Sequence, residues 1–140
     1  MNYRQLTGQE IRLLEDNSCW AEDWSAISVA EDFKANYFHR VMFYGTIRLG
    51  TFEKSVEVSK GFVKHSGINN ATLRNVTIGD NCLIENIGNY INNYAIGDDC
   101  YISNVCTMET TEGATYGEGN LISVLNEVGN GNLTLFPGLD

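Results

Sequence analysis

The sequence predicts an all-β fold in which the chain winds into stacked, three-sided coils. The main observation is an 18-residue pattern written twice, at residues 73–90 and 91–108, with seven of the 18 positions identical. Unrelated segments of ordinary composition would share about one position. Within the pattern, a large apolar residue recurs at every sixth position: Ile78, Ile84, Tyr90, Ile96, Ile102 and Met108. Because an α-helix repeats every 3.6 residues, it cannot keep a strict period of six on one face.

A coil with three flat sides of six residues each accounts for both periods. Stacked coils pair as parallel strands about 4.8 Å apart. This arrangement predicts that Ile78 lies beneath Ile96 and that Ile84 lies beneath Ile102. Gly79 and its counterpart in the second copy then turn the corners, because glycine adopts backbone angles that other residues resist.

The N-terminal region, residues 1–26, is expected to be a helical cap on the first coil. Thr7 and Glu10 have the spacing of a capping box, which predicts a short helix from Gly8 to Asp16. The apolar side of this helix and the two tryptophans, Trp20 and Trp24, would cover the open edge of the stack. A strand is expected over residues 27–33.

The coil domain is expected to span residues 27–136, with a tail at 137–140 that looks truncated after Pro137. Residues 38–49 repeat the apolar spacing of residues 73–84 and are interpreted as a diverged coil. The two segments start 35 residues apart, about 17 more than one coil needs, so the excess must leave the stack. We expect a β-hairpin excursion at about 50–67, turning near Lys60 and Gly61. A further bulge is expected over residues 109–115.

Charge is distributed unevenly along the 140 residues. The net charge is −9, and no lysine or arginine occurs from Asn75 to Asp140. Nucleic acid and anionic membrane surfaces are therefore poor partners. No apolar run approaches 18 residues and the N-terminus is polar, so no membrane helix or secretory signal is expected, and a cytoplasmic location fits. Four cysteines without CxxC spacing are interpreted mainly as reduced core residues, with no metal site.

Two pentapeptides carry a resemblance to a known superfamily. Ile78-Gly79-Asp80-Asn81-Cys82 and Ile96-Gly97-Asp98-Asp99-Cys100 resemble the hexapeptide signature of left-handed parallel β-helix proteins, a fold used by trimeric acyltransferases. Neighbouring segments also resemble a narrower, uncharacterised bacterial hexapeptide-repeat family, whose members extend beyond the position that matches residue 140. The resemblance implies a left-handed parallel β-helix of about five coils, with this chain as an N-terminal part.

The same resemblance implies what an active site would need. Acyltransferases of this fold place a histidine base between subunits and run coenzyme A along the coils. Of the two histidines, His65 is the catalytic candidate, because it lies where the basic excursion rejoins the coils, whereas His39 is interpreted as a surface or cap residue. Lys60, Lys64 and Arg74 are the candidate ligand-binding residues.

Two functional hypotheses remain open, and so does the question of whether the protein is an enzyme. Coenzyme A and nucleotide sugars carry phosphates that proteins usually bind with Lys, Arg or helix N-termini, and the coils after Arg74 offer no such side chain. This favours a non-catalytic β-helix module of a longer bacterial protein, serving assembly or ligand binding. The alternative is a hexapeptide-class transferase, acyl or nucleotide-sugar related, acting at a subunit interface. No cofactor is predicted, and coenzyme A enters only under the alternative. The expected partner is a second copy of the chain, as in a trimer, or the rest of a longer chain.

Overall fold

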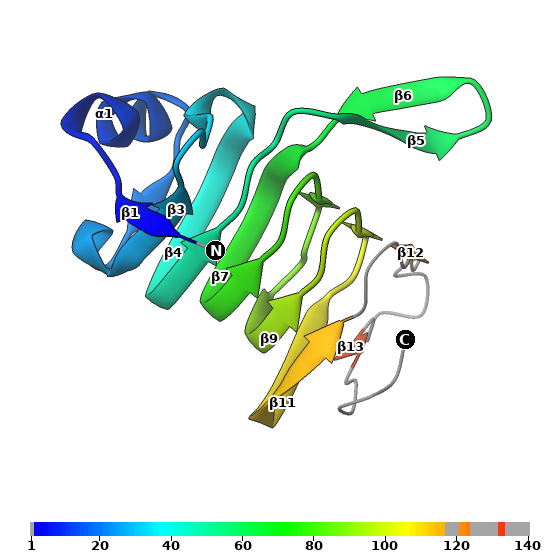
Figure 1. Cartoon of the computed structure of the whole chain (residues 1–140). Helices are drawn as coiled ribbons and strands as arrows, with labels where there is room; N and C mark the ends of the chain where they lie inside the picture. Colours follow the sequence, from blue (N-terminus) through cyan, green and yellow to red (C-terminus); the bar gives the residue numbers. More distant parts are fainter. Residues whose placement is uncertain (1, 117–120, 124–131, 134–140) are drawn as a thin grey trace.

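Strands make up most of this protein, which confirms the all-β class (Figure 1). The computed structural model describes the backbone of residues 2–116, 121–123 and 132–133, and the side chains up to residue 110. Its helical elements are α1 (Gly8–Asp16) and two short 3-10 helices, η1 (Trp24–Ala26) and η2 (Ala35–Tyr37). Its strands are β1 (Tyr3–Gln5), β2 (Trp20–Ala21), β3 (Ile27–Ala30), β4 (Phe38–Leu49), β5 (Ser55–Ser59), β6 (Phe62–His65), β7 (Gly67–Ile78), β8 (Leu83–Glu85), β9 (Tyr90–Ile96), β10 (Tyr101–Ser103), β11 (Thr107–Tyr116), β12 (Leu121–Ser123) and β13 (Asn132–Leu133).

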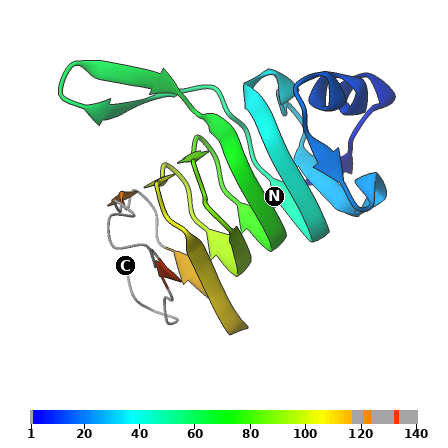
Figure 2. The ribbon, with the colours of Figure 1, turned by 180° about the vertical axis from the view of Figure 1, so that it is seen from behind.

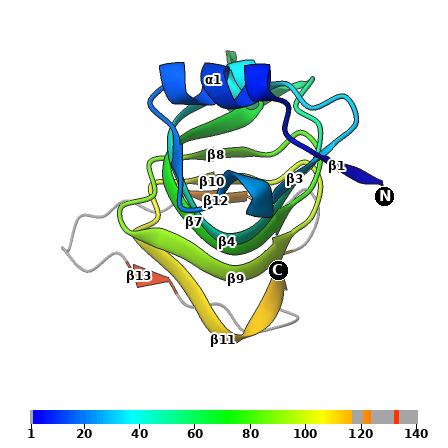
Figure 3. The same ribbon diagram turned by 90° about the vertical axis from the view of Figure 1, so that its left-hand side faces the viewer.

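Most strands pair in parallel along three sides of a repeating coil (Figure 3). Side A contains β2, the middle of β4 and β7, and the first parts of β9 and β11, followed by β13. Side B contains β3 and the later parts of β4, β7, β9 and β11. Side C contains the starts of β4 and β7, followed by β8, β10 and β12.

Each side carries a column of buried side chains, because alternate residues of a strand point inward. The columns are Ala21, Phe43, Leu73, Ile91 and Met108 on side A, Val29, Leu49, Ile78 and Ile96 on side B, and Phe38, Ile68, Ile84 and Ile102 on side C. These residues belong to one continuous core cluster. Each large side chain contributes roughly 1.5–3 kcal/mol by leaving water.

The 18-residue register predicted from the repeat is confirmed at its centre. Ile78 pairs with Ile96, and Ile84 pairs with Ile102. The period then drifts, since Ile91 pairs with Met108, 17 residues on, and Ile102 pairs with Ile122, 20 residues on. β11 is irregular between Glu109 and Ala114, where the bulge was expected. The strict six-residue period is wrong at Tyr90, which is half-exposed while its neighbour Ile91 is buried.

The N-terminal region contains the helix that its sequence predicts. α1 has the predicted bounds, and its capping box is complete: Thr7 accepts a hydrogen bond from the Glu10 amide, and the Glu10 carboxylate accepts one from the Thr7 amide. Leu14 is fully buried beneath the helix. The strand expected over residues 27–33 ends earlier, at Ala30, where the chain turns. An unexpected antiparallel strand, β1, covers the free edge of β3, so the sheet is mixed.

The alignment predicted for the first coil is wrong by five residues. Phe38 pairs with Ile68 rather than lying over Leu73, and Phe43 takes the place over Leu73. The apolar spacing of residues 38–49 also fits residues 68–78, one side of the coil earlier, and the strands adopt this alignment. One extra residue in β4, a β-bulge, then shifts the register by one residue after Tyr44. Gly45, with φ +65°, forms this bulge in the left-handed region that glycine favours.

The excursion between β4 and β7 is an antiparallel hairpin of β5 and β6, within the expected stretch 50–67. It turns at Lys60 and Gly61 and projects beside the stack, as the view from behind also shows (Figure 2). Phe62 and Val63 are more than half exposed on it. The division into domains remains a prediction, and the tail at 137–140 lies outside the described residues.

Asparagines, rather than the expected glycines, turn the corners of the coil. Six asparagines have positive φ angles: Asn70, Asn75, Asn81, Asn86, Asn93 and Asn104. Asparagine tolerates this left-handed conformation better than other non-glycine residues. Some of them also bond along the stack, since the Asn70 side chain donates to Asn86 Oδ1 at 3.1 Å. At position 79, glycine is needed because there is no room for a side chain, not because of its backbone angles. A Cβ there would lie 2.3 Å from Asp98 Oδ1 on the next coil.

The cysteines are free thiols, as predicted. Cys82 and Cys100 are fully buried, whereas Cys106 is only half-buried. A hydrogen bond with Cys100, together with burial, raises the pKa of Cys82, which keeps its thiol protonated. These two residues therefore act as small apolar core residues.

Candidate functional site

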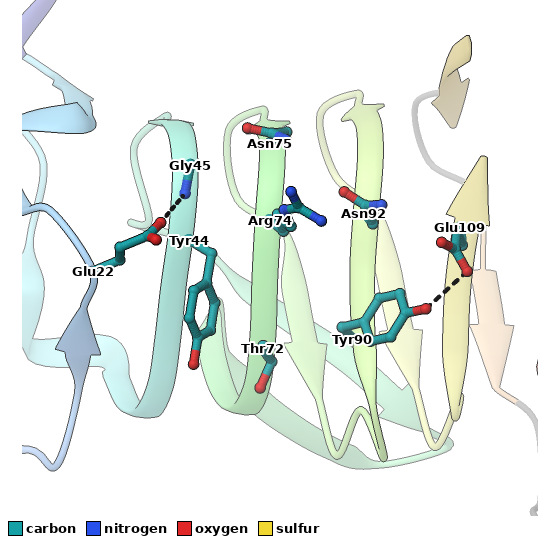
Figure 4. A pocket seen from close by; sticks show the side chains of 9 residues that line it. All are labelled: Glu22, Tyr44, Gly45, Thr72, Arg74, Asn75, Tyr90, Asn92 and Glu109. Carbon is teal, nitrogen blue, oxygen red and sulfur yellow. Dashed lines mark hydrogen bonds between the residues drawn. The ribbon is translucent and has the colours of Figure 1, made fainter. Parts of the chain in front are cut away.

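On the outer surface of side A, polar side chains from four neighbouring strands lie in one row. Tyr44, Arg74, Asn92 and Glu109 are successive pairing partners across β4, β7, β9 and β11. Each follows an inward residue of the buried column, so strand alternation points it outward. The regular stacking of the coils therefore builds this row (Figure 4).

A cavity of about 550 Å³ opens over this row. We call it the side-A pocket; it is lined by Glu22, Tyr44, Gly45, Thr72, Arg74, Asn75, Tyr90, Asn92 and Glu109. Its volume lies within the range of roughly 300–1,000 Å³ found for small-molecule sites.

Asn92 is the unusual residue of the pocket. Its side chain is 8% exposed, and its Oδ1 atom has no hydrogen-bond partner. A buried acceptor without a partner costs about 1–3 kcal/mol, and such groups are rare in folded proteins. The fold therefore keeps an unsatisfied amide oxygen buried just behind the wall of an open pocket.

Arg74 lies beside Asn92 in the row, and its side chain is exposed. Among the described residues, no hydrogen bond or ion pair engages its guanidinium group. The two carboxylates of the pocket have other contacts: Glu22 accepts a hydrogen bond from the Gly45 amide at 3.3 Å, and Glu109 accepts one from the Tyr90 hydroxyl at 2.8 Å. Arg74 is therefore available to an external anion or acceptor.

Aromatic rings stand on both sides of Arg74. Figure 4 shows Tyr44 on one side of Thr72 and Arg74, and Tyr90 on the other. The ring of Trp20, 46% exposed, packs against Tyr44 with centroids 5.4 Å apart. The hydrogen bond to Glu109 raises the pKa of Tyr90, so its hydroxyl remains a donor. The pocket thus combines flat apolar faces with donors and acceptors.

A second, smaller cavity of about 290 Å³ lies at the base of the hairpin, on the outer surface of side C. Here the ring of His65 stacks on Tyr37 at 3.5 Å, and its Nδ1 atom is 2.7 Å from the carbonyl oxygen of Ser66. Since a carbonyl only accepts, Nδ1 carries the proton of this hydrogen bond. The Lys64 ammonium group binds the buried Glu85 carboxylate at 3.0 Å, which ties the hairpin to the coils.

The structure separates the four site residues that the sequence suggested. His65 and Lys64 line the second cavity, together with His39, which was interpreted only as a surface or cap residue. Arg74 lines the side-A pocket, on another side of the coil. Lys60 is exposed at the hairpin turn and lines neither cavity. The catalytic and binding roles suggested for these residues remain predictions.

Sequence reasoning missed most of the side-A pocket. The 18-residue repeat already aligns Arg74 with Asn92, so this pair could have been found from the sequence. Tyr44 was hidden by the five-residue alignment error, and Glu109 by the 17-residue step to β11. No part of the described chain gathers three metal-ligating side chains at one point. Within that same part, no helix has the length and apolar character needed to cross a membrane.

Comparison with known proteins corrects the superfamily suggested by the pentapeptides. An uncharacterised protein of the bacterium Treponema pallidum (strain Nichols) is 28% identical over 148 residues, which cover 98% of this chain and 20% of that protein. The chain therefore spans about a fifth of the length of this relative. No solved structure matches this chain.

The identification with the hexapeptide-repeat, acyltransferase-like superfamily and its bacterial branch is wrong, because the comparisons show a different family and the sheet mixes parallel and antiparallel strands. The pentapeptides reflect the local geometry of a coil corner, which unrelated chains can share. Residues 3–140 match the family described as "Domain of unknown function (DUF4954)", and the chain belongs to that family.

Proposed function

We propose that this chain is a non-catalytic, ligand-binding module of a longer protein, and that it binds a small polar ligand in the side-A pocket. The module is a left-handed parallel β-helix whose regular coils hold the pocket residues in register. Its partners are the remainder of a longer chain and further copies of the module.

The β-helix assignment is supported by the register of the strands. Parallel pairing on three sides, with central steps of 18 residues, is the pattern of a three-sided helix. The sense in which the ribbon turns, viewed along the stack in Figure 3, favours the left-handed form. Such a scaffold is rigid, because each coil is bonded to the coils before and after it.

The unpaired oxygen of Asn92 carries the proposal of ligand binding. Leaving this oxygen unpaired costs about 1–3 kcal/mol, which a hydrogen bond donated by a ligand would offset. The unengaged guanidinium of Arg74 in the same row indicates that a polar ligand would meet two prepared contacts. Sites that have evolved for binding commonly hold such groups ready in the free protein.

A non-catalytic role is supported by the chemistry of the lining. The described residues around the pocket include no histidine, cysteine or serine, and so no nucleophile paired with an imidazole base. Binding needs only the donors, acceptors and rings that are present. The second cavity contains His65, and its lysine neighbour is engaged by Glu85 rather than free for a substrate.

Saturation-transfer NMR on the 140-residue chain tests the proposal. The probes are four separate mixtures of neutral sugars, sugar acids, amino acids and nucleotides. We expect at least one mixture to show transfer that Asn92→Ala weakens about tenfold, the equivalent of one hydrogen bond. Asn36→Ala, which removes an exposed asparagine outside the pocket, is the matched control. Absence of transfer from all four mixtures, or equal binding by the Asn92 variant, would refute the proposal.

A further inference from the structure

We infer that the ligand of the side-A pocket is an acidic saccharide, whose hexuronic acid unit places its carboxylate on Arg74 and its ring against the pocket tyrosines. This inference rests on the proposed binding function and names its ligand class.

The charge of the pocket selects a ligand with few negative charges. Arg74 supplies one unengaged cation, while Glu22 and Glu109 supply two carboxylates within the same lining. A single carboxylate can form two parallel hydrogen bonds with a guanidinium group. A phosphate dianion or diphosphate would add repulsion from both glutamates, in a chain whose net charge is already −9.

The hydrogen-bonding groups of the pocket match hydroxyls. The Asn92 amide offers a donor at one end and an unsatisfied acceptor at the other. A hydroxyl both donates and accepts, so it can pair with the NH2 group of this amide and, once the side chain turns toward the pocket, with its buried oxygen. Glu22 and Glu109 each accept one hydrogen bond within the described structure and retain lone pairs for further hydroxyl donors. Several hydroxyls on one small ring are the defining feature of a sugar.

The aromatic rings favour a pyranose over a free amino acid. Tyr44 and Tyr90 present faces on either side of Arg74, and Trp20 supports the ring of Tyr44. The axial C–H groups of a pyranose form a flat apolar surface that stacks on such rings. An amino acid such as glycine could pair its ammonium group with a glutamate, but it has no flat apolar ring to lay against the tyrosines. Stacking of a sugar ring on the tyrosines therefore favours a pyranose over an amino acid.

The length of the row fits more than one sugar unit. Tyr44 to Glu109 crosses four strands, and with strands about 4.8 Å apart the row extends about 14 Å. A hexose unit in an extended chain advances by about the spacing of one strand. The pocket can therefore hold a short oligosaccharide with one unit centred on Arg74.

Isothermal titration calorimetry of the 140-residue chain tests the ligand class. The probes are trisaccharides of galacturonic acid and of glucuronic acid, the neutral trisaccharides of galactose and glucose, glycine, and glucose 1-phosphate. We expect at least one uronic trisaccharide to bind at least tenfold more tightly than its neutral counterpart and than the other probes. Arg74→Gln should abolish this preference. Arg48→Ala removes an exposed arginine of the same strand system outside the pocket and should leave binding unchanged.

The outcomes separate the two proposals. If a neutral trisaccharide, glycine or glucose 1-phosphate binds best, and Asn92→Ala weakens it, the acidic-saccharide inference is wrong while the binding function stands. If uronic trisaccharides bind but Arg74→Gln has no effect, the placement of the carboxylate on Arg74 is wrong. If no probe binds here and no mixture shows transfer by NMR, both proposals fail. Circular dichroism of each variant checks that the fold is retained.

Discussion

Replacing Gly79 with alanine tests whether the coils are stacked as closely as the structure indicates. The added Cβ would lie 2.3 Å from Asp98 Oδ1 and 2.9 Å from the carbonyl carbon of Gly97. Contacts this short do not occur, so the neighbouring coil would have to move. The carboxylate cannot simply rotate away, because Asp98 Oδ1 accepts a hydrogen bond of 2.7 Å from the Asp80 amide.

The expected cost combines two effects. Losing a hydrogen bond to a charged group costs about 1.5–3 kcal/mol. Forcing the backbone of a packed coil outward costs about 1–3 kcal/mol more. We therefore expect Gly79→Ala to lower the free energy of unfolding by about 2.5–6 kcal/mol, a large part of the roughly 5–15 kcal/mol of an ordinary domain.

Urea unfolding followed by circular dichroism measures this loss. Gly8→Ala is the matched control, because a Cβ at Gly8 has no atom within 4 Å and the residue lies in a helix. It should stabilise the chain by up to about 1 kcal/mol. Asp98→Ala alone should cost only the hydrogen bond, and the double variant with Gly79→Ala should cost less than the sum. A loss below about 1 kcal/mol for Gly79→Ala would refute the close stacking.

Three further substitutions test the cap, the hairpin and the core. The hydrogen bond from Arg4 lowers the pKa of Glu10 below its ordinary 4.5. The ionised carboxylate therefore stabilises the fold above pH 4.5, and this stability disappears as the pH falls through the folded pKa. Glu10→Gln should reduce the free energy of unfolding at pH 7 and flatten its decline in acid, measured by unfolding at pH 3–7. Lys64→Ala leaves the Glu85 carboxylate, whose side chain is 7% exposed, without its cation, and should cost about 1 kcal/mol and speed proteolysis of the hairpin. Ile102→Ala should cost about 2–5 kcal/mol in urea unfolding, because the side chain is fully buried.

Two of these substitutions have matched controls. Lys60→Ala removes an exposed lysine from the same hairpin and should change proteolysis little, whereas an effect equal to that of Lys64→Ala would contradict the role of the ion pair. Val63→Ala removes a side chain that is 57% exposed, and should change the free energy of unfolding by no more than about 0.5 kcal/mol. If acid unfolding is unchanged by Glu10→Gln, the cap does not depend on the Arg4 contact.

Elements defined by local spacing were predictable from the chain alone. Thr7 and Glu10 mark the start of α1 because a capping box depends on residues three apart. Ile78 and Ile96 pair as predicted because a repeat of fixed length needs no knowledge of distant contacts. The hairpin could be located because the excess chain between two coils has to leave the stack.

Features that depend on one irregular residue were not predictable. The bulge at Gly45 shifts the register of β4 by one residue after Tyr44, and no local signal distinguishes it from a longer loop elsewhere. Seven residues rather than six separate the buried Ile84 from the next inward residue, so Ile91 is buried and Tyr90 is only half-buried. Tyr90 consequently lines the pocket, although its spacing favours a core position.

By itself, the sequence determined that the chain is an all-β stack with a repeat of 18 residues, since apolar periodicity reports directly which residues face the core. The tertiary structure decided which outward residues meet wherever the repeat is irregular, because their neighbours there depend on the summed register of every coil. Arg74 and Asn92 lie one repeat apart and can be aligned from the sequence. Only the structure shows that Tyr44 and Glu109 join their row, and that the Asn92 oxygen is unpaired beside an unengaged guanidinium group.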